Sequence, residues 1–325
     1  MTRESTGSTL RSAAPTEANS GASVAGEDNY RDAVKAYYEA NGYVVVRDLI
    51  PGSAIDHLLE IYSAQIIPSR TRFFRQNTNR YERNELSSYG YVEQSFLDIH
   101  AFGHFPLFAR AALDIFCHQN LLTMLSRVTG SESHNLMQSM LFDMNTHTQP
   151  HQDWWYLDSV PAGNLIAAWI ALEDIHVDAG RFYVLPKSQR VKLHEDGLAY
   201  SEWKARMRAY ADARAPDLSA PKLRKGDVLF WNSRTIHGSF ATLDRKRSRK
   251  SLTAHFLPAQ FKFGNLFTTK EWVTYRKHGE CLWFANQPEY SLKASLVSAV
   301  KNLLYDRPAL LRQVRRLQRG GIADY

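Results

Sequence analysis

A succession of short β-branched and aromatic runs in the middle of the chain most constrains its fold. Turns containing Gly, Pro, Asn or Asp separate several of these runs, and helical patterns precede them. Many short strands after N-terminal helices favour a sandwich or jelly roll with the helices packed outside. The predicted strands cover residues 136–144, 165–172, 181–185, 228–231 and 252–257. We therefore expect a mainly β fold with flanking helices.

The segments around these strands divide the 325-residue chain into a tail, a domain and an extension. Residues 1–27 are mostly Ser, Thr, Gly, Ala and Glu with little to bury, and we expect them to be disordered. The domain spans 28–265, and apolar spacing predicts helices near 30–41, 54–61 and 107–128, with an inserted helix and loop at 201–220. Residues 66–105 show little periodicity, which is equally consistent with a functional lid and with a long surface loop.

The C-terminal extension, 266–325, carries most of the basic excess. Residues 291–325 hold seven Lys and Arg against two Asp, so this segment accounts for +5 of the net charge of +7. Apolar spacing predicts helices over 291–305 and from Pro308 onward. Two interpretations remain open: residues 291–320 bind an anionic membrane surface as a basic amphipathic segment, or the apolar faces pack on the β-core. Binding of nucleic acid is not expected, because no RNA-binding or helix-turn-helix signature accompanies the charge.

The cysteines and the apolar runs bear on the compartment. Cys117 and Cys281 are far apart in sequence and form no disulfide framework, which favours a reducing compartment. The longest uncharged apolar run, near 160–172, is too short to span a bilayer. We expect a cytoplasmic protein, placed peripherally on the inner face of a membrane if the basic helices bind lipid.

His151-Gln152-Asp153 is the motif with the most direct chemical meaning. An imidazole and a carboxylate two residues apart point to the same side of an extended strand. They supply two ligands of a 2-His-1-carboxylate site, which holds non-heme Fe(II) with open positions. A single His-x-Asp is weak evidence, but His237 follows the predicted strand 228–231 beside a glycine and is a candidate for the third ligand.

Arg249 begins the last predicted strand and suggests a partner for an acid. A guanidinium pairs with a carboxylate through two parallel hydrogen bonds, which an ammonium cannot do. A 2-oxo acid that chelates iron through its keto oxygen and one carboxylate leaves its far carboxylate several ångströms away. An Arg on a neighbouring strand suits that second carboxylate.

Several of these runs, in this order, resemble the phytanoyl-CoA dioxygenase family of Fe(II)/2-oxoglutarate oxygenases over roughly residues 30–260. The runs are 38–46, 151–153, 169–174, 178–180, 185–186, 237–239 and Arg249. The resemblance implies a double-stranded β-helix, a cupin-like jelly roll, with iron on His151, Asp153 and His237. It also implies that Arg249 and Ser239 hold 2-oxoglutarate in a pocket lined by Trp169 and Met140.

The same resemblance implies a reaction. A dioxygenase of this kind uses O2 and 2-oxoglutarate, releases succinate and CO2, and oxidises an unactivated C–H bond. In related halogenases the position of Asp153 is Gly or Ala, so a carboxylate here favours hydroxylation. We expect a hydroxylase acting on a small-molecule, lipid or glycolipid substrate. The alternatives are a non-catalytic protein that binds iron or 2-oxoglutarate, and a nucleic-acid-modifying oxygenase that uses the basic tail. His255 and four other histidines show no ligand spacing, and we expect them to be packed or on the surface.

Overall fold

A nine-stranded sheet forms the centre of the part of the chain that the computed structural model describes. The described residues are 17–19, 24–78, 80–194, 198–265, 267–270, 273–285, 300 and 307. Across the sheet the order is β1 (Glu17–Asn19), β2 (Tyr43–Arg47), β10 (Val228–Asn232), β8 (Ile166–Ala171), β12 (Ser251–Pro258), β6 (His134–Phe142), β15 (Cys281–Phe284) and β14 (Tyr275–His278), and β5 (Phe96–Leu97) also pairs with β6.

The central strands are buried on both faces, and alternate side chains serve two different cores. On β8, Ile166 and Ile170 pack into the core shared with the helices, whereas Ala167 and Trp169 pack into a second core on the other face. Strands β2 and β10 divide in the same way. This division follows from the two-residue period of a strand, and it explains why these segments are apolar throughout.

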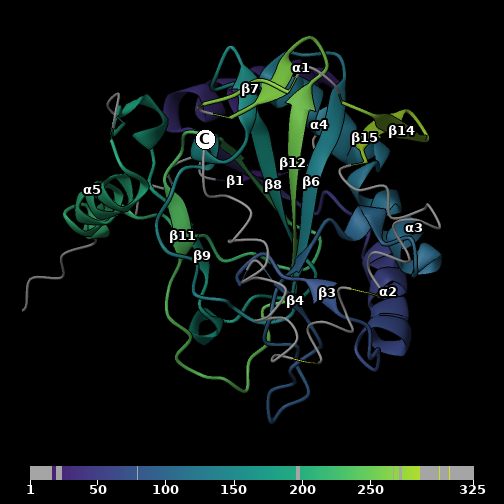
Figure 1. Ribbon diagram of the computed structural model, residues 1–325. Coiled ribbons are helices and arrows are strands. Elements are labelled where there is room, and N and C mark those ends of the chain that lie inside the picture. Colours follow the sequence, from purple (N-terminus) through teal and green to yellow (C-terminus); the bar gives the residue numbers. More distant parts are fainter. Residues whose placement is uncertain are drawn as a thin grey trace, which may run out of the picture.

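Helices cover one face of the sheet, and Figure 1 shows α2, α3 and α4 on the right of the strands. The helices on this face are α1 (Val24–Asn41), α2 (Gly52–Ile61), α3 (Pro106–Phe116) and α4 (Gln119–Thr129), whereas α5 (Tyr200–Asp212) lies on the other side. The single helix predicted over 107–128 is in fact two. His118 has an extended backbone, and its ring nitrogen accepts a hydrogen bond from the N–H of Asn120, which caps α4.

A smaller layer lies on the other face, to the left in Figure 1. Strands β9 (Phe182–Val184) and β11 (His237–Ser239) pair antiparallel, and single bridges add His151 beside β11 and Ser219 beside β9. Strand β7 (Asp158–Val160) pairs with β13 (Lys262–Gly264). The predicted mainly β fold with flanking helices is confirmed. The predicted inserted helix is α5, which packs through Trp203 next to β9 and β11.

The predicted secondary structure of two segments needs correction. The extension 266–325 is not wholly helical, because β14 and β15 form a hairpin and β15 pairs parallel with β6. The open edge of β6 offers backbone partners, and Trp283 and Phe284 bury their rings there. Within the predicted disordered tail, Glu17–Asn19 pairs parallel with β2. The helices predicted at 291–305 and beyond Pro308 lie outside the described residues, apart from Val300.

The segment 66–105 is anchored more firmly than its sequence suggests. It contains β3 (Phe73–Phe74), β4 (Tyr81–Glu82) and β5, and Phe73 and Phe96 pack into the helix-side core. Arg75 is fully buried, with its guanidinium carbon 4.3 Å from the centre of the Phe96 ring and Nη2 donating to Asn84 Oδ1 at 2.7 Å. Its function as a lid stays a prediction.

The two cysteines, distant in sequence, meet in the fold. Cys117 follows α3 and Cys281 begins β15, and both are free thiols. A hydrogen bond between them raises the pKa of Cys117 and lowers the pKa of Cys281. Among the described residues, no helix combines the length and the hydropathy needed to cross a membrane.

Candidate metal and cosubstrate site

A backbone pairing brings the two predicted histidine ligands together. His151 N–H donates to His237 O at 3.0 Å, and His237 N–H donates to His151 O at 2.9 Å. This reciprocal exchange is the hydrogen-bonded pair of an antiparallel ladder, in which opposite side chains share one face. The ring centres are therefore only 4.1 Å apart.

Asp153 completes the group, although its backbone is no longer that of a strand. The chain turns into a 3-10 helix at Asp153–Trp155. Asp153 Oδ1 lies 3.6 Å from His151 Nε2 and 3.5 Å from His237 Nε2. One ligand atom from each residue falls within 4.8 Å of the others, and this is the one such His/Cys/Asp/Glu group among the described residues. The structure thus brings together the three side chains that the sequence singled out.

Backbone carbonyls fix which nitrogen of each ring is free. His151 Nδ1 lies 2.9 Å from Gln149 O, and His237 Nδ1 lies 2.9 Å from Thr235 O. A carbonyl only accepts, so each Nδ1 carries the hydrogen and each Nε2 keeps its lone pair. Both lone pairs are then available to a cation beside Asp153, which is the arrangement typical of metal-binding histidines.

Burial and neighbouring charge set the protonation of this group. Burial lowers the pKa of His237 to about 3, so its imidazole is neutral. Burial by itself raises the pKa of Asp153, but attraction to the protonated forms of His237 and His255, together with hydrogen bonds from His151 and His255, outweighs burial and holds that pKa well below its usual range. A neutral imidazole beside an ionised carboxylate is the state that binds a divalent metal.

Arg249 lines the same cavity with an unpaired positive charge. It is 2% exposed, its Nη1 donates to Gly180 O at 3.3 Å, and its Nε has no hydrogen-bond partner. Burial lowers its pKa to about 10, so it is still charged. The adjacent Lys250 is within 3.4 Å of Asp143 and 3.6 Å of Glu173, whereas no carboxylate among the described residues lies at ion-pair distance from Arg249. A buried charge without a partner is costly, so this cavity favours an anionic ligand.

The other predicted pocket residues divide into two groups. Met140 and Trp169 line the cavity that contains the three candidate ligands and Arg249. Ser239 is buried but is not among the lining residues. Its hydroxyl accepts a hydrogen bond from Thr148 N–H at 2.9 Å, which ties β11 to the loop before His151. The remaining lining residues are Gln76, Phe142, Thr148, Phe182, Trp231, Thr253 and His255.

His255 and Trp231 are the site residues that the sequence analysis missed. His255 is 2% exposed and lies on β12, two residues after Thr253 on the cavity face, where a β-bulge follows it. Trp231 ends the apolar run of β10, and its ring faces the cavity. Counting in twos from Arg249 would have placed Thr253 and His255 on one face. The indole of Trp231 gave no signal, because a tryptophan in an apolar strand is typical of a core.

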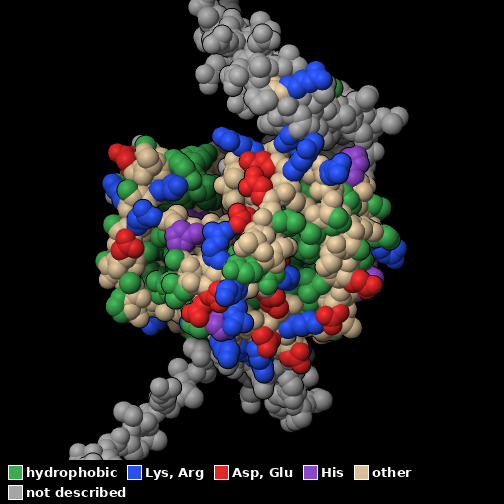
Figure 2. All heavy atoms as spheres, turned by 90° about the horizontal axis from the view of Figure 1, so that it is seen from below, with side chains coloured by type: hydrophobic (Ala, Val, Ile, Leu, Met, Phe, Trp, Pro, Cys, Tyr) green, Lys and Arg blue, Asp and Glu red, His purple; other side chains and the backbone are tan. Residues whose placement is uncertain are grey.

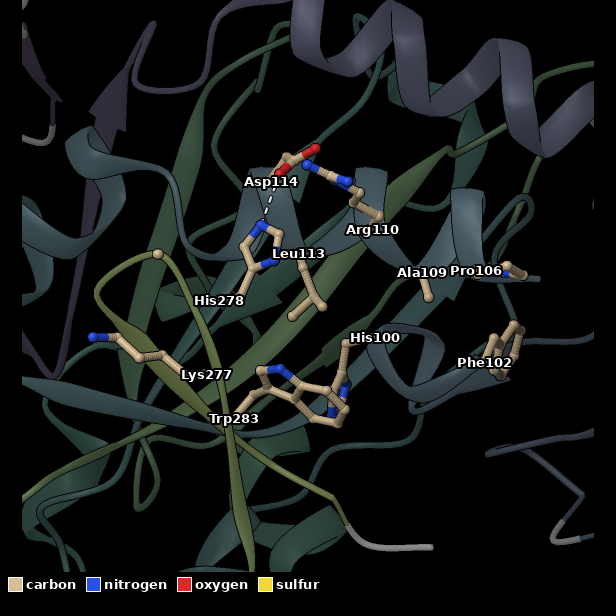
Figure 3. A pocket seen from close by; sticks show the side chains of 11 residues that line it. His100, Phe102, Pro106, Ala109, Arg110, Leu113, Asp114, Lys277, His278 and Trp283 are labelled. Atoms are coloured by element: carbon tan, nitrogen blue, oxygen red, sulfur yellow. Dashed lines mark hydrogen bonds and ion pairs between the residues drawn. The ribbon is translucent and has the colours of Figure 1, made fainter. Parts of the chain in front are cut away.

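A larger pocket lies elsewhere, between α3 and the β14–β15 hairpin (Figure 3). Its volume is about 550 Å³, and none of the predicted site residues lines it. His278 points to Asp114 across it, with Nε2 and Oδ1 2.7 Å apart. On its floor His100 packs edge-on against Trp283.

Comparison with known proteins agrees with this geometry. A family model described as phytanoyl-CoA dioxygenase (PhyH) matches residues 38–251. The chain belongs to this family. A probable phytanoyl-CoA dioxygenase of Caenorhabditis elegans is 24% identical over 240 residues, which cover 68% of this chain and 73% of the relative. The peroxisomal phytanoyl-CoA dioxygenase of Homo sapiens is 24% identical over 242 residues, which cover 69% and 68%.

Solved structures share the fold of this PhyH-family chain at low sequence identity. The epimerase SnoN, in complex with Fe3+, alpha ketoglutarate and nogalamycin RO, has a TM-score of 0.55 and 16% identity over 80% of this chain and 100% of its own. EctD from S. alaskensis, with 2-oxoglutarate and 5-hydroxyectoine, has a TM-score of 0.52 and 18% identity over 73% and 80%. The double-stranded β-helix that the sequence resemblance implied is thereby confirmed.

Proposed function

We propose that this PhyH-family chain is an Fe(II)- and 2-oxoglutarate-dependent dioxygenase that hydroxylates an unactivated C–H bond of a small molecule or lipid. The main support for the proposal is the set of residues that line one cavity. Two histidines with free Nε2 atoms, an ionised carboxylate and an unpaired arginine all line it.

The donor set fits the metal that the family uses. His151, His237 and Asp153 offer two nitrogens and one oxygen, the facial triad of non-heme Fe(II) oxygenases, which leaves positions open for other ligands. Iron in such a site activates O2 at the expense of 2-oxoglutarate, which is converted to succinate and CO2. Zn²⁺ accepts the same atoms, so the metal content of the purified protein is a necessary first measurement.

The chain's own residues supply position and a dry environment. Arg249 offers paired N–H groups to the far carboxylate of the cosubstrate, and the rings of Phe142 and Trp169 lie 5.7 and 5.9 Å from its guanidinium carbon. These rings exclude water and strengthen that ion pair. Gln76, from the 66–105 segment, lines the cavity, and this supports the hypothesis that the segment contacts the substrate. Ser239 supports the site by holding Thr148, and a direct contact with the cosubstrate stays a prediction.

Hydroxylation is the reaction that we favour, because this chain has Asp153 at the position where related halogenases have Gly or Ala. The fold itself does not decide the reaction, since its neighbours include an epimerase and the carbocyclase SnoK. The test is anaerobic loading with Fe(II) and 2-oxoglutarate, then exposure to O2 with a panel of acyl-CoA, lipid and polycyclic substrates. Succinate and an oxidised product in equal amounts support the proposal.

A non-catalytic role predicts a different outcome in the same assay. A protein that only binds iron or 2-oxoglutarate would bind its ligand and release no succinate with any substrate. A nucleic-acid substrate is less favoured. The face seen in Figure 2 mixes basic, acidic and hydrophobic side chains and shows no broad basic surface. Oligonucleotides belong in the panel as a comparison.

The membrane hypothesis concerns residues 291–320, almost all of which lie outside the described residues. It rests on the basic excess of this segment in the sequence. Co-sedimentation with anionic and neutral liposomes, for the full chain and for a chain ending at Tyr290, tests it. Equal recovery of both proteins in the supernatant at low salt would exclude a membrane-bound lipid substrate.

A further inference from the structure

The two oxygens of Asp153 have different surroundings. Oδ1 faces the histidine nitrogens, 3.6 Å from His151 Nε2 and 3.5 Å from His237 Nε2. Oδ2 faces Trp231 and accepts a hydrogen bond from its Nε1–H at 2.8 Å. The carboxylate is therefore oriented, with one oxygen toward the candidate metal position and one away from it.

His255 lies on the same side as Trp231. Its Nε2 is 3.3 Å from Asp153 Oδ2, and its Nδ1 has no hydrogen-bond partner in the described structure. The ring meets Trp231 edge to face, with centres 6.1 Å apart. Because this polar ring is only 2% exposed, it needs a hydrogen-bond partner among its neighbours. The nearest acceptor is Oδ2.

We propose that Trp231 and His255 are positioning residues that hold Asp153 Oδ2 on the protein side, so that the carboxylate presents only Oδ1 to the metal. This inference rests on the proposed function and adds to it a pair of residues that determine how the carboxylate binds. An Asp that binds through both oxygens occupies an additional position on the ion. An Asp that binds through Oδ1 alone leaves three positions of an octahedral ion open, enough for a chelating 2-oxo acid and O2.

The packing of Trp231 supports this role. Trp231 is 1% exposed, and its ring packs against both Phe182, at 5.0 Å between ring centres, and His237, at 4.9 Å. Its indole nitrogen therefore cannot move without disturbing two neighbours. Partners that orient a ligand in this way typically change metal affinity roughly 10- to 100-fold when they are removed.

The test measures metal binding without turnover. Mn(II) binding to the full-length protein is followed by titration calorimetry and by electron paramagnetic resonance, for wild type, Trp231→Phe, His255→Phe and His255→Gln. Trp231→Phe keeps an aromatic ring and removes the N–H, and we expect a roughly 10-fold or greater rise in Kd. His255→Phe also weakens binding, whereas His255→Gln, which keeps an N–H donor, restores part of the affinity.

Two controls separate a positioning role from a general loss of structure. Trp283→Phe changes a buried tryptophan in the other pocket, and thermal unfolding of each variant reports folding. With Fe(II) and 2-oxoglutarate under anaerobic conditions, the charge-transfer band in the visible spectrum shifts in Trp231→Phe and not in Trp283→Phe. The inference is overturned if folded Trp231→Phe and His255→Phe bind Mn(II) with the wild-type Kd and show an unshifted band. If wild type itself binds no metal, the proposed function fails instead.

Discussion

Two pockets in the described part of the chain differ in a way that their volumes do not reveal. The pocket between α3 and the β14–β15 hairpin measures about 550 Å³, and the cavity around His151, Asp153 and His237 measures about 50 Å³ by the same measure. In the larger pocket the buried histidine is fully bonded, with His100 Nδ1 2.6 Å from Ser139 Oγ and Nε2 3.1 Å from Phe284 O. In the smaller cavity Arg249 Nε and His255 Nδ1 lack hydrogen-bond partners, and His255 Nε2 lies 3.3 Å from Asp153 Oδ2.

Unsatisfied groups occur elsewhere in the described residues too, so what distinguishes the smaller cavity is that such groups lie beside the three candidate metal ligands. Polar atoms in a folded interior are almost always hydrogen-bonded, because leaving one unbonded costs about 1–3 kcal/mol. A cavity that keeps several such atoms is incomplete until a ligand enters it. A pocket whose polar groups are already satisfied offers a ligand little beyond contact area.

The largest expected effect comes from removing a ligand in the smaller cavity. His237→Ala should abolish stoichiometric binding of Fe(II) or Mn(II) and all succinate formation, because two donors do not make the facial triad. His278→Ala in the larger pocket is the matched control and should leave both unchanged. Metal titration of the two proteins checks this, and retained binding in folded His237→Ala would remove the site from this account.

The second effect concerns the unpaired cation. Arg249→Gln should weaken 2-oxoglutarate binding roughly 30-fold or more, since losing one partner of a buried charge pair costs about 2–5 kcal/mol. Metal affinity without cosubstrate should change little. Lys277→Gln, an exposed cation of the larger pocket, should leave the 2-oxoglutarate Kd unaltered. Calorimetry in the presence of Mn(II) measures both, and an unchanged Kd in Arg249→Gln would assign the carboxylate to another residue.

The third effect concerns the larger pocket, where we expect a substitution to change stability and not metal affinity. His100→Ala should lower the free energy of unfolding by about 2–3 kcal/mol, because it removes a buried side chain together with its ring contacts to Ser139 Oγ and Phe284 O. Its metal affinity should equal that of wild type. Chemical denaturation and Mn(II) titration of the same sample measure the two quantities. A weakened metal site in His100→Ala would mean that the two pockets are coupled.

The smallest effect is the pH dependence of stability in the metal-free protein. Burial lowers the pKa of His100, and burial lowers the pKa of His134 to about 4. The unfolded chain titrates these residues near pH 6.5, so it binds more protons than the folded chain below that pH, and stability falls as the pH falls. Each such histidine contributes about 1.4 kcal/mol per pH unit between about 6.5 and its folded pKa. Denaturation between pH 7 and 5 should show a shallower slope in His134→Gln than in wild type.

The sequence by itself was sufficient for the donor types and the strand pattern. His151 and Asp153 were paired on the expectation of strand geometry, and their side chains do meet although Asp153 begins a 3-10 helix. Arg249 stood out because only arginine offers a charged fork. The apolar runs of β8, β10 and β12 predicted buried strands, since each is buried on both faces. These inferences depend on local backbone geometry, which the sequence encodes directly.

Only the tertiary structure decided which distant residues meet. The reciprocal pairing of His151 with His237, the contact of Cys117 with Cys281, and the addition of β15 to the edge of β6 all join segments far apart in the chain. Trp231 and His255 belong to the site because two strands of one sheet face the same cavity. Such contacts arise from the packing of whole layers, and no local propensity within any single segment specifies them.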